Sequence, residues 1–180
     1  MQIDTSLVGK YGFYYSGDPA WNSGGVDEET GVPDEQRVKF LAAWTDATVT
    51  GDYAAVPQRE GLSPIRWTLQ HIGSRQVRAI LQEVEAFNAG KAPEQMSTPW
   101  IAMYRAARLG LVAVEGLRIG EDEFVVEVGR DPDLKAECAT HKSMDIISRI
   151  TNGENRQIGN SIINEIGNQV VGGGSPAGKS

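Results

Sequence analysis

The last eight residues match a motif that binds nucleotide phosphates. Residues 173–180 read G-G-S-P-A-G-K-S, which fits the pattern G-x-x-x-x-G-K-S. In that motif, backbone amides and the lysine hold the phosphates at the start of a helix that follows the loop. No residue follows Ser180 in this sequence, so we expect no such helix. Glycine and small polar residues at 172–180 favour a flexible tail instead, and we expect no nucleotide cofactor.

Cys138, His141 and Asp145 are a second set of side chains whose types could do chemistry. Their spacing could supply three ligands to zinc, but a structural zinc site takes four. The other histidine, His71, has no ligand-like neighbour. Cys138 and His141 could also be the nucleophile and base of a small enzyme, although such pairs usually join distant segments. We expect structural roles for both, with no metal, and the enzyme is the third-ranked interpretation.

Two acidic turns carry carboxylates of the kind used in acid–base catalysis. They lie at residues 121–123 and at Asp131 and Asp133. Carboxylates are also common in the solvated turns of an acidic protein, and we favour that interpretation. The sequence contains no nucleophile elbow, zinc-protease motif or dinucleotide-binding motif. We expect a protein without enzymatic activity.

Composition and charge argue against several classes of protein. The chain has 180 residues, 40% of them hydrophobic and 23% charged, as in ordinary soluble domains. A net charge of −7 argues against general nucleic-acid binding, which needs a basic surface. The single cysteine cannot form an intramolecular disulfide, and no apolar run suits a signal peptide or a membrane span. We expect a soluble, cytoplasmic protein with one domain.

Residues 1–33 combine frequent turn formers with a cluster of aromatic side chains. The turn formers exclude a long helix, whereas the aromatic residues suit short strands. One interpretation is a hairpin that fixes the N-terminus to the body. The other is an arm that docks on a partner, since Tyr and Trp are common interface anchors. Both stay open, and the residues concerned are Tyr11, Phe13, Tyr14, Tyr15 and Trp21.

Hydrophobic periodicity predicts an α+β core over residues 34–171, mostly helical and with a small antiparallel sheet. The clearest helix begins at Ser74 as N-cap. The next follows Pro99 and is apolar on nearly every side, with Arg105 and Arg108 limiting its burial. The predicted elements are helices at 34–48, 74–88, 98–114, 140–151 and 155–171, a strand at 64–69, a hairpin at 117–128 and a short helical turn at Asp131-Pro132.

The last predicted helix carries Ile158, Ile162 and Ile166 on one stripe. Gly159 and Gly167 lie eight residues apart, on nearly one side of this helix. Each glycine weakens a helix by about 1 kcal/mol, so close packing against another helix is a reasonable compensation. We predict that the stripe and the aromatic cluster form the surfaces that bind partner proteins.

Three segments resemble a class of small accessory proteins encoded by tailed bacteriophages. They are SPIRWTLQHI at residues 63–72, YRAARLGLVAVEGL at 104–117 and IINEIGN at 162–168. The resemblance covers about residues 60–170. It implies a non-enzymatic role in tail assembly or in the virion.

Tail assembly chaperones of this class bind the tape measure protein and the tail tube protein in the host cytoplasm before the tube polymerises. Some are made in two lengths by a −1 frameshift near the stop codon, and Gly178-Lys179 can be encoded by a compatible heptamer. We expect such a chaperone. The alternative is a minor virion component of the neck, tail or capsid, and self-association stays open for both.

Overall fold

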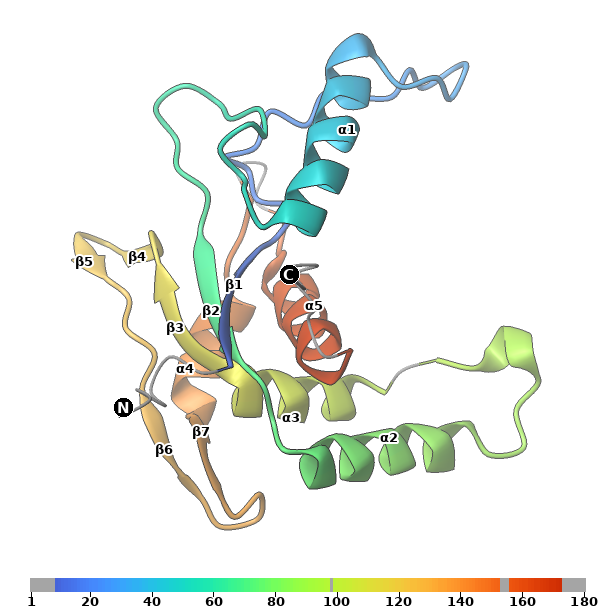
Figure 1. Cartoon of the computed structure of the whole chain (residues 1–180), viewed down its shortest axis with the longest axis vertical. Coiled ribbons are helices and arrows are strands. Elements are labelled where there is room, and N and C mark those ends of the chain that lie inside the picture. Colours follow the sequence, from blue (N-terminus) through green and yellow to red (C-terminus); the bar gives the residue numbers. More distant parts are fainter. Residues whose placement is uncertain (1–8, 98, 153–155, 173–180) are drawn as a thin grey trace, which may run out of the picture.

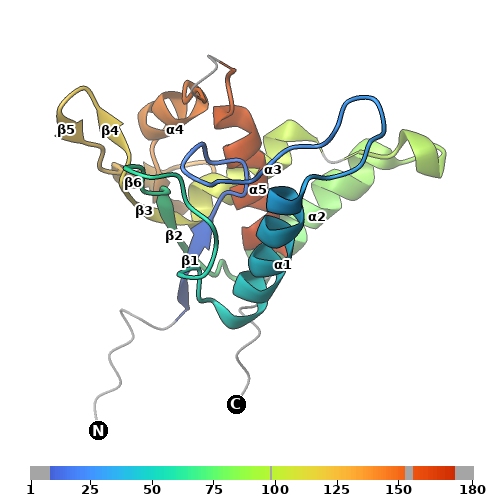
Figure 2. The same ribbon diagram turned by 90° about the horizontal axis from the view of Figure 1, so that it is seen from above.

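The computed structural model describes residues 9–97, 99–152 and 156–172 of the chain. Helices and small antiparallel sheets combine in one α+β domain, as the sequence predicts (Figures 1 and 2). The helices are α1 (Glu35–Thr50), α2 (Ser74–Asn88), the 3-10 helix η1 (Pro93–Gln95), α3 (Trp100–Gly110), α4 (His141–Ser148) and α5 (Gly159–Val171). The strands are β1 (Lys10–Tyr14), β2 (Arg66–Gln70), β3 (Leu111–Glu115), β4 (Arg118–Ile119), β5 (Asp122–Glu123), β6 (Val128–Asp131) and β7 (Ala136–Ala139).

A three-stranded antiparallel sheet in the order β1-β2-β3 forms one layer of the body. In the central strand β2, Trp67 and Leu69 alternate with polar residues and are fully buried. Phe13 of β1 lies opposite Trp67, so the N-terminal strand completes the buried face of the sheet. Two small hairpins, β4-β5 and β6-β7, extend from the sheet.

Helices α3 and α5 pack against each other at the centre of the body (Figure 1). Their contact is close because α3 offers small, fully buried side chains such as Ala102 and Ala106. A Cβ atom at Gly167 of α5 would overlap the carbonyl oxygen of Met103, and one at Gly110 of α3 would overlap the side chain of Val170. The prediction that Gly167 lets another helix approach closely is therefore confirmed.

Helix α1 belongs to a smaller unit that stands to one side of the body (Figure 1). This unit has a hydrophobic cluster of its own, made by α1 and the loops before and after it. The buried carboxylate of Asp18 accepts the backbone N–H groups of Ala20 and Ile65, both at 2.8 Å, which ties the two loops together. The cluster consists of Trp21, Phe40, Ala47 and Val56, with Tyr14, Ala43, Trp44 and Tyr53 packed around it.

Several predicted boundaries are wrong. The helix expected to run to Val114 ends at Gly110, and residues 111–115 form strand β3, because their backbone pairs with that of β2. The turn expected at Asp131-Pro132 is present at residues 132–135, where the Asp131 carboxylate accepts the N–H groups of Asp133 and Leu134, but it joins the two strands of the β6-β7 hairpin and is not part of a helix. Helix α2 is capped by Gly73, whose N–H donates to the Gln76 side chain, rather than by Ser74.

The aromatic residues at 11–21 form no local hairpin, although a short antiparallel bridge joins Val26 to Pro33 later in the segment. Strand β1 pairs instead with β2, some 50 residues further along the chain, through a register that places Tyr14 opposite Arg66. The segment is thereby part of the body's sheet. Of the tail expected at residues 172–180, all but Gly172 lies outside the described residues.

None of the described helices has both the length and the apolar character that crossing a membrane requires.

The α3–α5 contact predicts the effect of a single methyl group. Gly167→Ala should lower the free energy of unfolding by about 2 kcal/mol, because overpacking against a main-chain atom outweighs the gain in helix propensity. The measurement is urea unfolding followed by circular dichroism. On the exposed side of the same helix, Asn168→Ala should change stability by less than about 0.5 kcal/mol. Equal effects of the two substitutions would contradict the close-packing account.

Candidate functional site

Arg108 is the centre of a polar cluster on the face of α3 that meets the β6-β7 hairpin. The side chain is 6% exposed although arginine is rarely buried without a partner. Its Nη1 atom lies 2.8 Å from Asp131 Oδ2, and its Nε donates to the Ala139 carbonyl oxygen at 2.9 Å. Its Nη2 donates to Cys138 Sγ at 3.3 Å. The guanidinium thereby holds the hairpin on α3, and the expectation that Arg108 limits the burial of α3 is wrong.

His141 lies at the edge of this cluster, at the first turn of α4. Arg108 Nη1 lies 3.0 Å from His141 Nε2, and Tyr104 Oη lies 2.8 Å from His141 Nδ1. A guanidinium has only donors, so Nε2 must accept and the ring proton must sit on Nδ1, facing the tyrosine. Burial raises the pKa of Tyr104. The imidazole therefore stands between two fixed groups, beside a hollow of about 270 Å³ lined in part by these residues.

Cys138 does not have the surroundings of a nucleophile. It is 2% exposed, and burial raises the pKa of its thiol. Its sulfur accepts a hydrogen bond from Arg108 Nη2, and His141 Nε2 accepts one from Arg108 Nη1. Neither the thiol nor the imidazole is therefore directed at an open position where a substrate could react. Asp145, the third residue of the possible metal set, is ion-paired with Arg149 at 2.7 Å. Among the described residues, no three His, Cys, Asp or Glu side chains gather as a metal site would require.

The carboxylate of Asp131 is held in its charged form. The backbone N–H of Leu134 donates to it at 3.0 Å, and that of Asp133 does so at 2.9 Å. These bonds and the Arg108 guanidinium lower the pKa of Asp131, with the Leu134 bond as the largest cause. An ion pair this sheltered is a structural element of the hairpin.

The side chains predicted to bind partners pack inside the chain itself. Phe13, Trp21, Ile162 and Ile166 are buried in its two hydrophobic clusters. The other members of that prediction, Tyr11, Tyr14, Tyr15 and Ile158, are partly buried. In this conformation most of their surface is already used by the fold.

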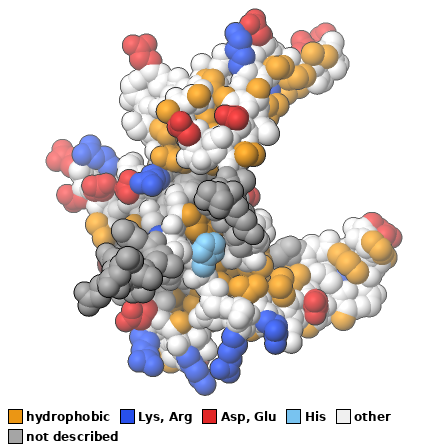
Figure 3. All heavy atoms as spheres, viewed as in Figure 1, with side chains coloured by type: hydrophobic (Ala, Val, Ile, Leu, Met, Phe, Trp, Pro, Cys, Tyr) orange, Lys and Arg blue, Asp and Glu red, His pale blue; other side chains and the backbone are white. Residues whose placement is uncertain are grey.

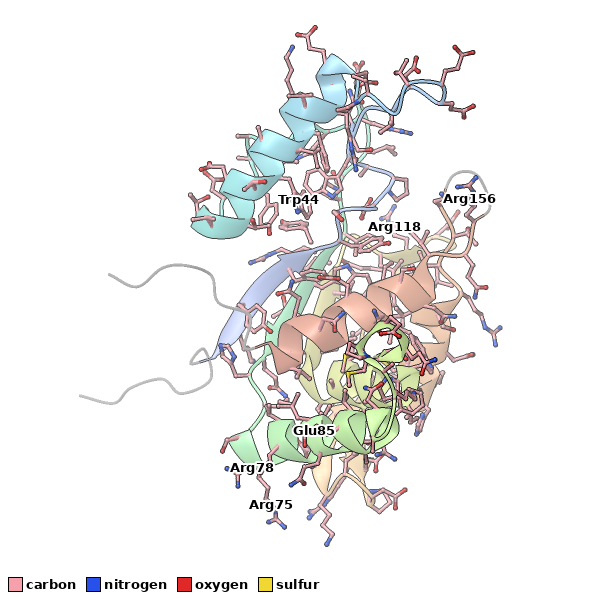
Figure 4. The ribbon with its side chains drawn as sticks, turned by 90° about the vertical axis from the view of Figure 1, so that its right-hand side faces the viewer. Trp44, Arg75, Arg78, Glu85, Arg118 and Arg156 are labelled. Carbon is pink, nitrogen blue, oxygen red and sulfur yellow. The ribbon has the colours of Figure 1, made fainter. Side chains whose placement is uncertain are left out.

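A small aromatic cavity of about 200 Å³ lies between α1, β1 and α5. Tyr14, Trp44 and Tyr53 line it, and Figure 4 shows Trp44 between α1 and the sheet. The hydroxyl of Tyr11 donates to the Gln169 carbonyl oxygen at 3.2 Å, and burial raises its pKa to about 12. Small-molecule sites usually measure about 300–1,000 Å³, so this cavity is below the common range.

Most of the large exposed apolar side chains lie on two parts of the molecule where the sequence analysis did not predict them. Large exposed apolar side chains concentrate on two projections, one formed by α1 and the loop before it and the other by α2, η1 and the start of α3 (Figures 1 and 3). The sequence shows the apolar periodicity of each helix. It does not show which of these apolar residues the rest of the chain leaves exposed. The exposed residues are Val26, Val32, Val38, Leu41 and Val49 on the first projection, and Leu81, Phe87, Met96, Trp100 and Ile101 on the second.

Comparison with protein-family models, with curated proteins and with solved structures finds no match to this chain.

The environment of Cys138 predicts slow reaction with a disulfide reagent such as Ellman's reagent. In the folded chain at about pH 8, the rate should be at least about 100-fold lower than in denaturant, because the reactive species is the thiolate. As a control, Glu137→Cys in a Cys138→Ser background places a thiol on the exposed side of the same strand. Equal rates for the two thiols would show that Cys138 is accessible and activated.

Asp131 predicts a dependence of stability on pH. The pKa of Asp131 is lower in the folded chain than in the unfolded chain, where it is about 3.9. The carboxylate therefore stabilises the fold above the unfolded pKa, and this stabilisation is lost as the pH falls through the folded pKa. Wild type should therefore lose more unfolding free energy than Asp131→Asn between about pH 6 and about pH 3. Urea unfolding at each pH is the measurement. Glu137, an exposed acid of the same hairpin, provides the control: Glu137→Gln should leave the dependence of the unfolding free energy on pH nearly as in wild type. If the unfolding free energies of Asp131→Asn and wild type fall in parallel as the pH is lowered, the role assigned to Asp131 is wrong.

Proposed function

We propose that this chain is a non-enzymatic assembly protein that holds partner proteins on the apolar surface of its α2 projection. The observation that carries the proposal is the set of exposed apolar side chains at Leu81, Phe87, Met96, Trp100 and Ile101. Contiguous exposed apolar surface on a soluble protein commonly marks an interaction site. The partner surface would be an apolar segment, such as one face of an amphipathic helix.

The amphipathic helix α2 extends away from the body, and its own chain covers only part of its apolar stripe (Figure 1). Ile80 is buried and Val84 packs against the main core, whereas Leu81 and Phe87 remain 43% and 47% exposed. On the opposite face, Arg75 and Arg78 point into solvent (Figure 4). A helix with a charged outer face and a half-covered apolar stripe is suited to receive a second apolar element.

The chain fixes the shape of this projection with polar contacts. The side chain of Asn88 donates to the carbonyl oxygens of Val84 and Ser97, and it accepts the N–H of Ser97. Arg105 of α3 pairs with Glu83 of α2 at 2.7 Å. Preorganisation of this kind lowers the entropic cost of binding a partner.

The chemistry-bearing groups of the described chain support a binding role rather than a catalytic one. Cys138, His141, Asp131 and Arg108 bond to one another and join the hairpin to α3. An activated nucleophile needs a lowered pKa or a base directed at it, and the pKa of Cys138 is raised.

The resemblance of residues 60–170 to tailed-phage accessory proteins gives the proposed partners. In a tail assembly chaperone, the α2 projection would hold the tape measure or tail tube protein in the host cytoplasm until the tube assembles. Mass spectrometry of purified particles separates this role from that of a minor component of the neck, tail or capsid. A chaperone would be absent from the particle, whereas a virion component would be present.

The proposal predicts that small polar substitutions on α2 abolish partner binding while the fold is retained. Leu81→Ser with Phe87→Ser should reduce recovery of the tape measure or tail tube protein from infected cells at least about tenfold, because apolar anchors contribute about 1–2 kcal/mol each. Gln82→Ser with Glu85→Ser, on the polar face of the same helix, is the matched control and should bind normally.

Circular dichroism should give the same helix content for both double variants. If the apolar variant is folded and recovers both tail proteins as well as wild type does, the α2 projection is not the binding surface and the proposal fails.

A further inference from the structure

Helix α1 is apolar on two opposite faces. One face packs on the cluster of Trp21 and Val56 through Phe40 and Ala47. The opposite face points away from the molecule, and on it Val38, Leu41 and Val49 are 53%, 45% and 52% exposed. A surface helix ordinarily carries polar residues on its outer face. The outer face of α1 therefore has more apolar surface than its own fold uses.

The outer residues follow the spacing of a coiled-coil seam. Val38, Ala42, Thr45 and Val49 are separated by four, three and four residues, and all four are exposed. Such alternation keeps one narrow stripe facing a neighbouring helix over several turns. The two central positions are small, which lets a second helix approach closely.

The threonine in this stripe does not place a free hydroxyl in the seam. Thr45 Oγ1 donates to the Leu41 carbonyl oxygen of its own helix at 2.8 Å. At the edge, Thr48 Oγ1 donates in the same way to the carbonyl oxygen of Thr45 at 2.8 Å. Since a polar group costs little to bury once it is hydrogen-bonded, both threonines can present their methyl groups to an apolar partner.

Glu35, Lys39 and Asp46 lie along one flank of the seam, and Lys39 Nζ forms an exposed ion pair with Glu35 Oε1 of its own helix at 2.6 Å. At 100° per residue, Lys39 and Asp46 lie about 100° and 80° from Val38 around the helix axis, and both are exposed. The positions next to the other edge of the seam are Leu41 and Thr48, which carry no charge, and Arg37, further round on that side, lies over the ring of Phe40. In an antiparallel helix pair each flank meets the same flank of the other copy, whereas in a parallel pair it meets the opposite flank. An antiparallel pair of identical helices therefore brings Lys39 of each copy beside Asp46 of the other.

We infer that α1 pairs in antiparallel orientation with α1 of a second copy of this chain. Val38 then lies against Val49 of the second copy, and Ala42 lies against Thr45 of the second copy. In this register Lys39 and Asp46 of the second copy differ in height along the axis by about 3 Å, within reach of a lysine side chain. The same residues match on both sides, as a two-fold axis requires. The inference concerns α1 alone and does not depend on the function proposed for α2.

The size of the contact sets the strength of the pairing. One helix of 16 residues is about 24 Å long, and a single pair of such helices buries less than the roughly 1,600 Å² of a standard interface. The dimer should accordingly be weak, with a Kd of tens to hundreds of micromolar. Figures 1 and 2 show α1 at the periphery of the molecule, where a second copy can reach it.

Charge reversal on the flank gives a test specific to self-pairing. Sedimentation equilibrium from about 10 µM to about 1 mM should show a monomer–dimer equilibrium for wild type. Lys39→Glu makes positions 39 and 46, which face each other across the pair, both acidic, and Asp46→Lys makes both basic, so each variant alone should associate at least about tenfold more weakly. An equimolar mixture of the two should restore association, because acidic side chains at these positions then meet basic ones.

Lys10→Glu makes the same change of charge at an exposed position of β1, away from α1. This variant is the control and should dimerise as wild type does. Circular dichroism verifies that each variant is folded. A wild-type chain that stays monomeric up to about 1 mM would overturn the inference. So would a dimer that both single variants leave unchanged, or two folded variants whose mixture does not associate.

Discussion

The close contact between α3 and α5 is the constraint on which the rest of the structure depends. It exists because Gly110 and Gly167 remove the side chains that would separate the two helices, and because fully buried alanines line the same face of α3. With α5 seated this way, its isoleucines fill the space between α3, α4 and the sheet. Elsewhere on α3, the β6-β7 hairpin covers Arg108 and supplies the carboxylate and carbonyl oxygens that bind its guanidinium. Helix α3 thus joins α5 through its small residues and the hairpin through its buried arginine.

The main core is built by α3, α4, α5 and the sheet, so that α1 and α2 lie at the edge of the molecule. Helix α2 touches the body mainly through Ile80 and Val84, and α1 packs on loops around its own aromatic cluster. Both helices have more apolar surface than these contacts cover, and Figure 3 shows this surface on the two projections. Covering it requires something other than the described chain. The proposed roles of the two projections, α2 for a partner protein and α1 for a second copy, follow from that shared property and from the different charge patterns around each surface.

The sequence predicted what depends on local pattern and failed where a distant contact decides. Amphipathic spacing placed α2 almost to the residue and gave the end of α5, which begins at Gly159, four residues later than predicted, and the glycine pair in α5 indicated close helix packing. The same pattern extended α3 through residues 111–114, because a run of apolar residues fits a buried helix and a buried strand equally well, and only pairing with β2 decides between them. Burial of Arg108 could not be foreseen, since its partners come from residues 131–141, which the chain folds back onto α3. The aromatic residues were recognised as anchors, but whether they anchor the fold or a partner depends on β2, far away in sequence.

Amide hydrogen exchange followed by mass spectrometry, on the chain at a concentration where it is monomeric, tests the central claim most directly. That claim is that a glycine-packed body carries the stability while the α2 projection stays uncovered. The backbone amides of α3 and α5 should exchange most slowly, through global unfolding, and those of residues 85–97 should exchange at least about 100-fold faster. Protection of residues 85–97 equal to that of α5 would contradict the account, because it would mean that the projection is already packed in the free chain.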